Sequence, residues 1–319
     1  MAVLVGGCRE PPRPEPDALA PAPDALEERV EVRVPEDAPG APTVRVATYN
    51  VHRYFDAVCD SGRCAAGDFE EAPTEEAFTQ QTDRIARAVL RLDSDVVLLQ
   101  EVETRGCLDA LQARLGALGA AYETAVHGEI GTPGSVDVAV LARWPRVATR
   151  LHRRTRLPLP DGGTTTFARE FLEVELRVRG RTVVVFAAHF RSMVGDDPAR
   201  RLAEAVAARE LVTASARRAP DALVVLGGDL NDTPGSPTLD ALEAGGGVVR
   251  VTRGLAPAAV ATYQYFGVGQ ALDHLHFAAD AAGRDVPGTA AVVRDRLDGR
   301  AGLGDSDHAA LRAEFTLGP

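Results

Sequence analysis

Lysine is absent from this chain of 319 residues, so all 35 of its basic residues are arginine. The absence excludes sites that need an ε-amino group, namely Walker-type nucleotide loops, Schiff-base enzymes and lysine general bases. Codon usage in a GC-rich genome is the simplest source of an all-arginine chain. Arginine can still make bidentate contacts to phosphate that lysine cannot make.

Aromatic residues are also scarce, at 5% of the chain, so the core must consist mainly of aliphatic strands. Positive charge is in deficit, because the formal net charge is −11. The overall field of an acidic protein does not attract nucleic acid, so binding of a polyanion must depend on local patches or bound cations. We find no apolar run long enough to cross a membrane.

The four cysteines are Cys8, Cys59, Cys64 and Cys107. None forms a Cys-x-x-Cys pair, which excludes the common zinc motifs. Cys59 and Cys64 flank "DSGR" and would form a disulfide in an exported protein, or remain two reduced loop cysteines. Cys107 is expected to be a buried helix residue.

The first 42 residues are predicted to be a lipobox-like start followed by a disordered tether. "LVGGC" resembles a bacterial lipobox, in which Cys8 would carry a lipid anchor, although the apolar segment before it is too short for a signal peptide. A start codon further upstream would explain this. Nine of the 21 prolines fall within residues 9–42, a composition typical of an extended tether. We therefore expect the protein in the cell envelope or outside the cell, or in the cytoplasm if the N-terminus is as written.

Residues 43–319 alternate between strand and helix patterns and are predicted to form one α/β domain. Predicted helices span 74–92, with Thr74 as N-cap, 107–118, and Asp197-Pro198 to about Arg218. The predicted strands are 43–51, 95–102, 135–144, 169–178, 181–190, 221–230, 270–278 and 308–317.

Polar residues gather at the ends of these apolar strands, namely Asn50, Glu101, His189, Asp229, Asn231, Asp273, Asp307 and His308. Any one of them alone is better explained as a strand cap or turn residue. Together they predict a site, because the ends of buried strands converge on one rim of a sheet.

The chemistry of this set points to phosphate ester hydrolysis. Three carboxylates (Glu101, Asp229, Asp307) and two amides (Asn50, Asn231) give an oxygen-rich set that suits Mg²⁺ or Mn²⁺ better than zinc. His189 and His308 remain for proton transfer, and Asp273 can hold one of them in a fixed tautomer. A metal ion with a histidine–carboxylate pair matches metal-assisted hydrolysis.

Ser306, Asp307 and His308 stand side by side near the C-terminus, but three consecutive residues cannot form a hydrolytic triad. A serine hydrolase would also need Gly-x-Ser-x-Gly, which is missing. Ser306 is instead predicted to be a turn residue that supports its neighbours.

The motifs resemble, in order, those of the endonuclease/exonuclease/phosphatase superfamily with its DNase I-like fold. The resemblance covers nearly all of the chain from Thr43 onward. It rests on "RVATYNV", "LLQEV", "VDVAVLARWP", "AAHFRS", "GGDLNDTP", "QALDHL" and "SDHAAL".

The resemblance implies an α/β fold in which a two-sheet β-sandwich is flanked by helices, giving four layers (α/β/β/α). It implies that His308, oriented by Asp273, acts as the general base for the attacking water. His189 would stabilise the phosphoryl oxygens or assist the leaving group.

The remaining site residues follow from the same resemblance. Asp229 and Asn231 would position water and phosphate. Glu101 would bind the metal ion, with Asn50 and Asp307 close by.

Several features bear on the substrate. Arg169 and Arg191 are candidate phosphate contacts, and "RWPRVATRLHRRTR" (143–156) either grips a phosphate backbone or forms a solvated strand edge. Tyr263, with Tyr265 and Phe266, would either stack on bases or pack internally. The stretch "TYQYFGVGQALDH" is most similar to bacterial exported nucleases of the superfamily.

Some motifs of relatives are missing. There is no Cys-Asp-Arg near Asp273, as in inositol polyphosphate phosphatases, and no Arg-x-Asp-Tyr, as in many abasic-site endonucleases. His274 stands where many relatives have an aromatic residue.

The sequence therefore predicts a monomeric Mg²⁺-dependent phosphodiesterase, most simply a nuclease. A phosphatase or phospholipid phosphodiesterase of the same fold is the alternative. A non-catalytic binding module is disfavoured because the site residues are complete. The acidic run from Asp56 to Asp83 is either a structural Ca²⁺ site or a solvated loop.

Overall fold

The computed structural model describes residues 42–195, 197–295 and 302–319. The lipid-anchor site predicted at Cys8 and the proline-rich tether lie outside the described residues. The first strand begins at Thr43, where the sequence predicted it.

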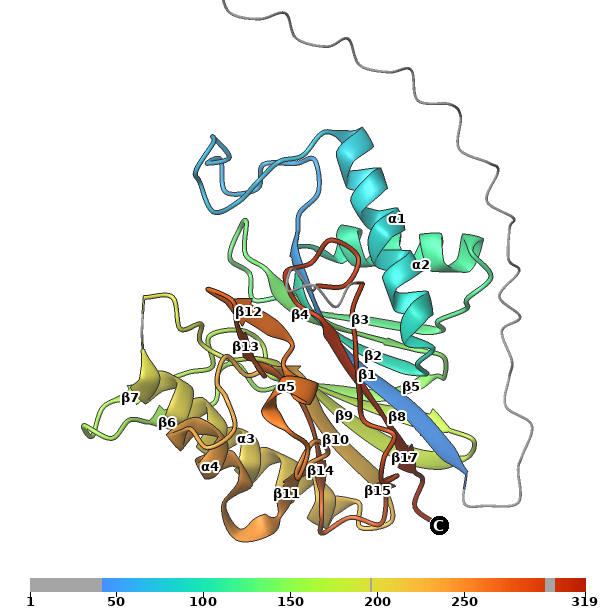
Figure 1. The fold of residues 1–319 in the computed structure, drawn as a ribbon, viewed down its shortest axis with the longest axis vertical. Coiled ribbons are helices and arrows are strands. Elements are labelled where there is room, and N and C mark those ends of the chain that lie inside the picture. Colours follow the sequence, from blue (N-terminus) through green and yellow to red (C-terminus); the bar gives the residue numbers. More distant parts are fainter. Residues whose placement is uncertain (1–41, 196, 296–301) are drawn as a thin grey trace, which may run out of the picture. The chain divides into compact units, whose positions relative to one another are not determined.

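Two mixed β-sheets form in the described part of the chain (Figure 1). The first, with seven strands, has the order β15 (Arg284–Asp285), β17 (Ala310–Thr316), β1 (Thr43–Tyr54), β2 (Val96–Val102), β4 (Asp137–Ala142) and β3 (Thr124–Gly128), with β16 (Ala291–Val293) also paired to β17. The second, with six, has the order β11 (Val248–Arg250), β14 (Asp273–Ala278), β10 (Leu223–Asp229), β9 (Arg181–His189), β8 (Leu172–Val178) and β5 (Arg146–Leu151).

Alternation along each strand gives each sheet two apolar faces. Val44 and Val46 of β1 face the other sheet, whereas Ala47 and Tyr49 face the helices. The core between the sheets is built in this way from alternate residues of β1, β2, β4, β8, β9, β10, β14 and β17.

Helices cover the outer face of each sheet (Figure 1). Helices α1 (Glu75–Leu92) and α2 (Arg105–Ala117) pack on the first sheet, and α3 (Pro198–Arg218) and α4 (Pro237–Glu243) pack on the second. The order is therefore helix, sheet, sheet, helix, which confirms the predicted four-layer fold. None of the helices in the described ranges has the length and apolar character needed to cross a bilayer.

Two of the three predicted helix starts are confirmed, whereas α2 begins at Arg105, two residues before the predicted start. Thr74 caps α1, since its hydroxyl accepts a hydrogen bond from Ala77 N at 3.2 Å. Asp197 caps α3 in the same way through Arg200 N at 3.1 Å, with Pro198 in the first turn. Cys107 is fully buried in α2, as expected.

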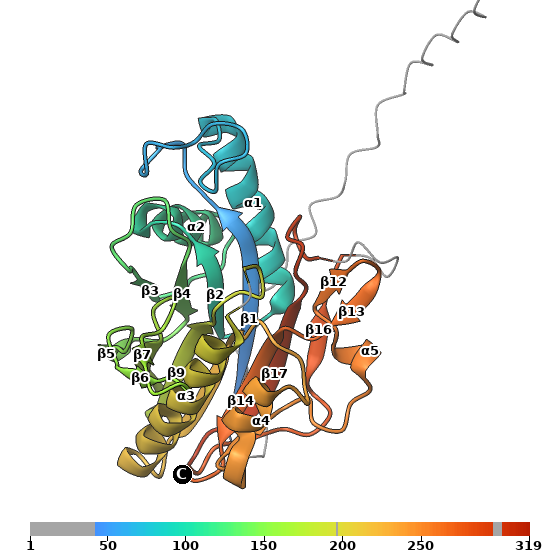
Figure 2. The same cartoon turned by 90° about the vertical axis from the view of Figure 1, so that its left-hand side faces the viewer.

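The sequence missed several short elements. Strand β3 was not predicted, nor were the hairpin of β6 (Leu157–Pro158) with β7 (Thr164–Thr165), the 3₁₀ turn η1 (Ala244–Gly246) and helix α5 (Pro257–Val260). The segment 270–278, predicted as one strand, is divided. Gln270 ends β13 (Val268–Gln270), which forms a hairpin with β12 (Tyr263–Tyr265), and β14 begins only at Asp273 (Figure 2).

The acidic loop between β1 and α1 folds around a buried carboxylate. Glu70 accepts hydrogen bonds from Asp60 N at 2.5 Å and Ser61 N at 2.7 Å. Cys59 and Cys64 form a disulfide across this loop, with Cα atoms 6.0 Å apart. Because backbone amides already bind the Glu70 carboxylate, the structural Ca²⁺ ion stays a prediction.

Glu103, next to this loop, gives a testable pH dependence. Burial, together with the charges of Asp56, Glu70 and Asp60, raises the pKa of Glu103 from 4.5 to about 8. The folded state therefore holds a proton that the unfolded state releases, and the wild type loses stability as pH rises from about 4.5 to 8. Glutamine mimics the protonated form. We expect Glu103→Gln to raise the urea midpoint clearly at about pH 8 and little at about pH 5, and an equal change at both would contradict this.

Candidate active site

The strand alternation that builds the inter-sheet core also determines which side chains point into the site. Asn50 continues the series of Val44 and Val46 along β1, so it points between the sheets. His189, Asp229 and Asp273 likewise continue the inward-facing series of β9, β10 and β14. The site is therefore the polar end of the core between the two sheets.

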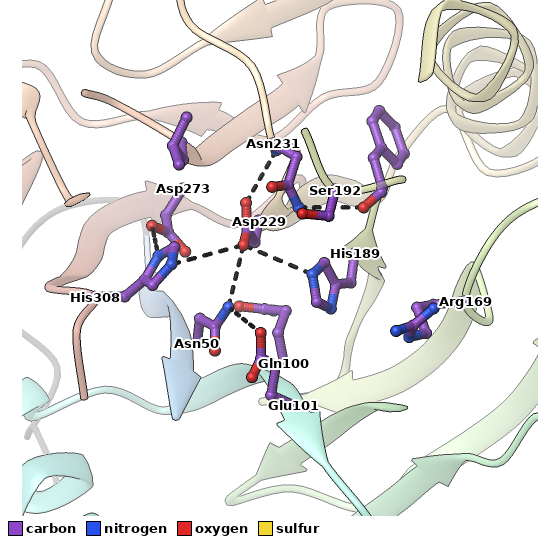
Figure 3. Close-up of polar contacts among 12 residues, drawn as sticks. Asn50, Gln100, Glu101, Arg169, His189, Ser192, Asp229, Asn231, Asp273 and His308 are labelled. Atoms are coloured by element: carbon purple, nitrogen blue, oxygen red, sulfur yellow. Dashed lines mark hydrogen bonds and ion pairs between the residues drawn. The ribbon is translucent and has the colours of Figure 1, made fainter. Parts of the chain in front are cut away.

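Asp229 lies at the centre of this site (Figure 3). In the second sheet it is in register with His189 on one neighbouring strand and with Asp273 on the other. Its Oδ2 accepts from Asn50 Nδ2 at 3.1 Å, and its Oδ1 accepts from Asn231 N at 2.9 Å. The Asn50 contact joins the two sheets at the site.

His308 and Asp273 form a buried pair. His308 Nδ1 donates to Asp273 Oδ2 at 2.8 Å, which leaves Nε2 directed toward Asp229, 3.9 Å from its Oδ2. The carboxylate thus holds the imidazole in one orientation and one tautomer. The partner of His308 is Asp273 and not its neighbour Asp307.

Ser306 supports the turn that carries His308. Its hydroxyl donates to Asn50 O at 2.7 Å and accepts from His308 N at 3.0 Å. Gly302 closes the same turn, where an added Cβ would lie 1.3 Å from Ser306 O. Because the Ser306 hydroxyl is hydrogen-bonded to backbone groups, it is not positioned as a nucleophile that His308 would activate.

Glu101 reaches the site through a bulge in β2. Its backbone is left-handed, with φ of 66°, and the pairing of β2 with β4 shifts register between Gln100 and Val102. Such a backbone costs a non-glycine residue about 1 kcal/mol. The turned side chain accepts from Asn50 Nδ2 at 3.2 Å and from Arg53 N at 2.9 Å.

His189 lies opposite His308, with its Nε2 3.7 Å from Asp229 Oδ2. In the view of Figure 3 it lies between Asp229 and Arg169. The Arg169 guanidinium is half-buried and donates to Val136 O at 2.7 Å. Arg191 follows β9, is half-buried, and has a buried Nε without a hydrogen-bond partner.

Two predicted site residues lie slightly apart from this centre. Asp307 Oδ1 is 2.8 Å from His52 Nδ1, and both side chains are nearly half exposed. Asn231, whose φ is 51°, donates through Nδ2 to Phe190 O at 3.2 Å. His52 was not identified from the sequence, although "YNVHRY" places it two residues after Asn50.

Burial and the neighbouring charges shift the pKa values of the site residues strongly. Burial, opposed by the Glu101 charge, lowers the pKa of His189 to about 4, so this imidazole is neutral. Burial and the Asp273 charge raise the pKa of Asp229 to about 7. Burial also disfavours the His308 cation, but the charges of Asp273 and Asp229 outweigh it and raise the pKa of His308 to about 10.

The residues present fit a hard divalent cation. Glu101 Oε1 and Asp229 Oδ2 converge on one amide nitrogen of Asn50, and Asp273 Oδ1 is buried without a hydrogen-bond partner. Ligand atoms of Asp229, Asp273 and His308 lie within 4.8 Å of one another. This buried excess of carboxylate oxygen is the donor set that Mg²⁺ or Mn²⁺ prefers.

A hairpin of β12 and β13 lies at the edge of the site. The Tyr263 ring is 4.9 Å from the His308 ring, and Thr262 Oγ1 accepts from Asp273 N at 3.1 Å. Beyond them, the side chains of Tyr265 and Phe266 are exposed, Phe266 at 91%.

The arginine-rich segment 143–156 forms the edge strand β5 and the turn after it. Arg150 pairs with Glu173 at 2.9 Å and Arg153 donates to Ile130 O at 3.3 Å, whereas Arg154 and Arg156 are not buried. The segment is thus partly a solvated strand edge, which was one of the two interpretations of its sequence; the other was a grip on a phosphate backbone.

Solved structures of several proteins share this fold. A truncated TDP2 of Caenorhabditis elegans is 18% identical, with 86% of this chain and 97% of that chain covered and a TM-score of 0.58. An endonuclease/exonuclease/phosphatase of Bacteroides vulgatus is 14% identical (86% and 99% covered, TM-score 0.60). TDP2 of D. rerio, complexed with a single strand DNA product, is 15% identical (86% and 98%, TM-score 0.59).

The family assignment rests on the sequence model, because likeness at such identities concerns the fold alone. A comparison with curated proteins gave no match. The model of the Endonuclease/Exonuclease/phosphatase family matches residues 47–308, from β1 to the terminal histidine. This confirms the predicted superfamily, and the chain belongs to the endonuclease/exonuclease/phosphatase family, whose members are hydrolases of phosphate esters.

Proposed function

We propose that this protein is a divalent-cation-dependent phosphodiester hydrolase that cleaves nucleic acid. The observation that carries the proposal is the buried His308–Asp273 pair, 2.8 Å apart, facing Asp229 and a neutral His189. This arrangement combines a fixed base, a hydrogen-bond donor for phosphoryl oxygen and converging carboxylates.

The proton path follows from the tautomer. His308 Nδ1–H is held by Asp273, so Nε2 accepts the proton of a water directed at phosphorus. Asp229, fixed by Asn50 and Asn231, orients that water. His189 Nε2 donates to a phosphoryl or leaving oxygen.

Glu101, Asn50 and Asp229, with Asp307 nearby, would hold the cation. Bound there, Mg²⁺ or Mn²⁺ offsets the charge on the phosphoryl oxygens. Arg169 and Arg191, the half-buried guanidinium groups on the His189 side, would contact the phosphate.

A nicking assay on supercoiled plasmid tests the proposal. We expect cleavage with Mg²⁺ or Mn²⁺, none with EDTA, and recovery when the metal ion is restored. A parallel assay would use single-stranded DNA and RNA, because TDP2 of D. rerio is described with a single strand DNA product. No cleavage of any nucleic acid at high enzyme would exclude the nuclease.

The exposed hairpin supports a substrate with bases. Phe266 and Gly267 form its turn with φ of 45° and 80°, a turn that strongly favours Asn-Gly. A phenylalanine in this backbone is strained, and its exposed ring recovers no burial energy. We infer that Phe266 and Tyr265 stack on unpaired bases beside the Tyr263–His308 contact.

The variant Phe266→Asn separates this role from stability. Asparagine tolerates the left-handed backbone, so the melting temperature should stay equal or rise. Loss of one stacking contact should raise KM for single-stranded DNA about 5- to 150-fold, since stacking contributes about 1–3 kcal/mol per base. Steady-state kinetics test this, with Val58→Asn, an exposed residue of the acidic loop, as control. An unchanged KM would contradict it.

A phospholipid phosphodiesterase is the second candidate. The same hairpin tip carries exposed Phe266 (91%) and Val268 (65%), which would also suit a lipid surface. Turnover of phosphatidylcholine or sphingomyelin vesicles, without cleavage of nucleic acid, would support this candidate.

We further propose that the protein acts in the cell envelope or outside the cell. The disulfide between Cys59 and Cys64 supports an oxidising compartment. Immunodetection in fractionated source cells tests this, and recovery with cytoplasmic markers would contradict it.

A further inference from the structure

A second group of acceptor side chains lies on the hairpin of β3 and β4, at the edge of the first sheet (Figure 1). His127 of β3, Glu129 just after it and Asp137 at the start of β4 each offer one ligand atom, all within 4.8 Å of one another. None of the three belongs to the site described above.

The tautomer of His127 is fixed by its surroundings. Its Nε2 lies 3.2 Å from Val102 O, and because a carbonyl only accepts, Nε2 carries the hydrogen. Burial lowers the pKa of His127, so the ring is neutral and Nδ1 has a bare lone pair. That side chain is 3% exposed, and Nδ1 has no hydrogen-bond partner.

Nδ1 faces another acceptor. The Glu129 carboxylate oxygen Oε2 is 3.7 Å away, with no proton available between the two atoms. Two lone pairs in this position repel each other unless a cation or a donor lies between them.

Asp137 adds a second buried acceptor atom without a partner. It is fully buried, and its Oδ2 accepts from Ile130 N at 3.2 Å and Ser135 Oγ at 3.3 Å. Its Oδ1 has no partner. A buried carboxylate oxygen without a partner is costly, so this second independent observation also points to an absent ligand.

We propose that His127, Glu129 and Asp137 bind a divalent transition-metal ion, Zn²⁺ or Mn²⁺, at a site distinct from the catalytic cation. One imidazole nitrogen with two carboxylates selects such ions over Mg²⁺ and Ca²⁺. The carbonyl of Val102 holds the imidazole from behind, as outer partners of metal-binding histidines do.

The spacing of the His127–Glu129 pair needs little adjustment. Ligand atoms about 2.1 Å from a tetrahedral Zn²⁺ ion lie about 3.4 Å apart, close to the 3.7 Å between Nδ1 and Oε2. Glu129, at 53% exposure, is the only one of the three that faces solvent, which gives the ion an entry path.

The site also has a structural consequence. Asp137 pairs in register with Val102, the residue after Glu101. A bound ion would tie the β3–β4 hairpin together directly behind the bulge that presents Glu101.

The experiment is isothermal titration calorimetry of the untagged, metal-stripped chain with Zn²⁺ and Mn²⁺ in excess Mg²⁺. Glu101→Gln serves as the background because it removes a carboxylate of the catalytic cation site. We expect one equivalent of Zn²⁺ in this background. Adding Glu129→Gln or Asp137→Asn should weaken that binding by about 10- to 100-fold or more.

Both substitutions keep the size of the side chain and the known hydrogen bonds. The amide oxygen introduced by Glu129→Gln can still accept from Gly131 N, which the Glu129 carboxylate binds at 2.7 Å. Glu123→Gln, at an exposed position just before β3, is the matched control and should change nothing.

A thermal melt gives an independent readout. Zn²⁺ should raise the melting temperature of the Glu101→Gln chain but not of the same chain with Glu129→Gln. No Zn²⁺ or Mn²⁺ uptake by the Glu101→Gln chain, or uptake that Glu129→Gln and Asp137→Asn leave unchanged, would overturn the proposal. Neither outcome depends on turnover, so the proposed hydrolase function is tested separately.

Discussion

Replacing His308 with glutamine is expected to lower kcat for phosphodiester cleavage about 10³- to 10⁴-fold. Glutamine fills a similar space and can donate to Asp273, but it cannot accept the proton of the attacking water. General-base catalysis contributes about 10²- to 10⁴-fold, and loss of a fixed base should approach the upper limit. Single-turnover kinetics on a labelled oligonucleotide would measure the effect on the chemical step.

Controls distinguish this loss from a folding defect. His152→Gln changes a histidine that pairs with Glu173 at 2.9 Å on the outer face of the second sheet, and should keep full activity.

Asp273→Asn should lose most activity, because the amide no longer fixes the Nδ1–H tautomer of His308. Wild-type rates in His308→Gln would mean that another group takes the proton.

The pH profile of kcat/KM also tests whether His308 is the general base. The carboxylates around His308 raise its pKa to about 10, and only the neutral ring is a base. A bound cation offsets those carboxylates, so cation binding and His308 protonation compete. Raising the Mg²⁺ concentration should therefore move the acid limb of kcat/KM to lower pH, and His308→Gln should abolish the limb.

The second large effect is expected from Glu101→Gln, a loss of about 10³-fold at a fixed low Mg²⁺ concentration. Removing one carboxylate charge weakens cation binding, and stabilisation by a cation amounts to several kcal/mol, with each ~1.36 kcal/mol giving tenfold in rate. The amide oxygen of the substituted side chain can still accept from Arg53 N, so the bulge should persist. The Mg²⁺ activation curve should shift to higher concentration and restore part of the rate.

Glu175→Gln is the charge-matched control, since it removes a carboxylate that pairs with Arg150 at 3.5 Å on the outer face of the second sheet. It should leave the Mg²⁺ curve in place. If Glu101→Gln also left it in place, Glu101 would not be a metal ligand.

Strand ends were the most predictable part of the site. His189, Asp229 and Asp273 end or begin buried strands, and Asn50 is the last residue of β1 before its pairing with β2 shifts register. The two-residue period places each of the four on the inner face. That His308 pairs with Asp273 was implied by the family resemblance alone. No local pattern links residues 35 positions apart.

Backbone irregularities were not predictable. Simple alternation would direct Glu101 toward the helices, and only the bulge with its left-handed backbone turns it to Asn50. The hairpin turn at Phe266 lacks the Asn-Gly signal, so no hairpin was predicted there. The bulge is fixed by the pairing of β2 with β1 and β4, which a single segment does not encode.

The in-register row of His189, Asp229 and Asp273 also bears on how the site is opened and regulated. Asp229 lies between the other two, and its backbone is held one strand spacing, about 4.8 Å, from the backbone of each, so side-chain rotation cannot change the order of the row. Separating these groups requires breaking the middle of a sheet, so their amides should exchange with solvent only through global unfolding. Control of this enzyme would then act on access past the β12–β13 hairpin, while the reacting groups stay assembled for the lifetime of the fold.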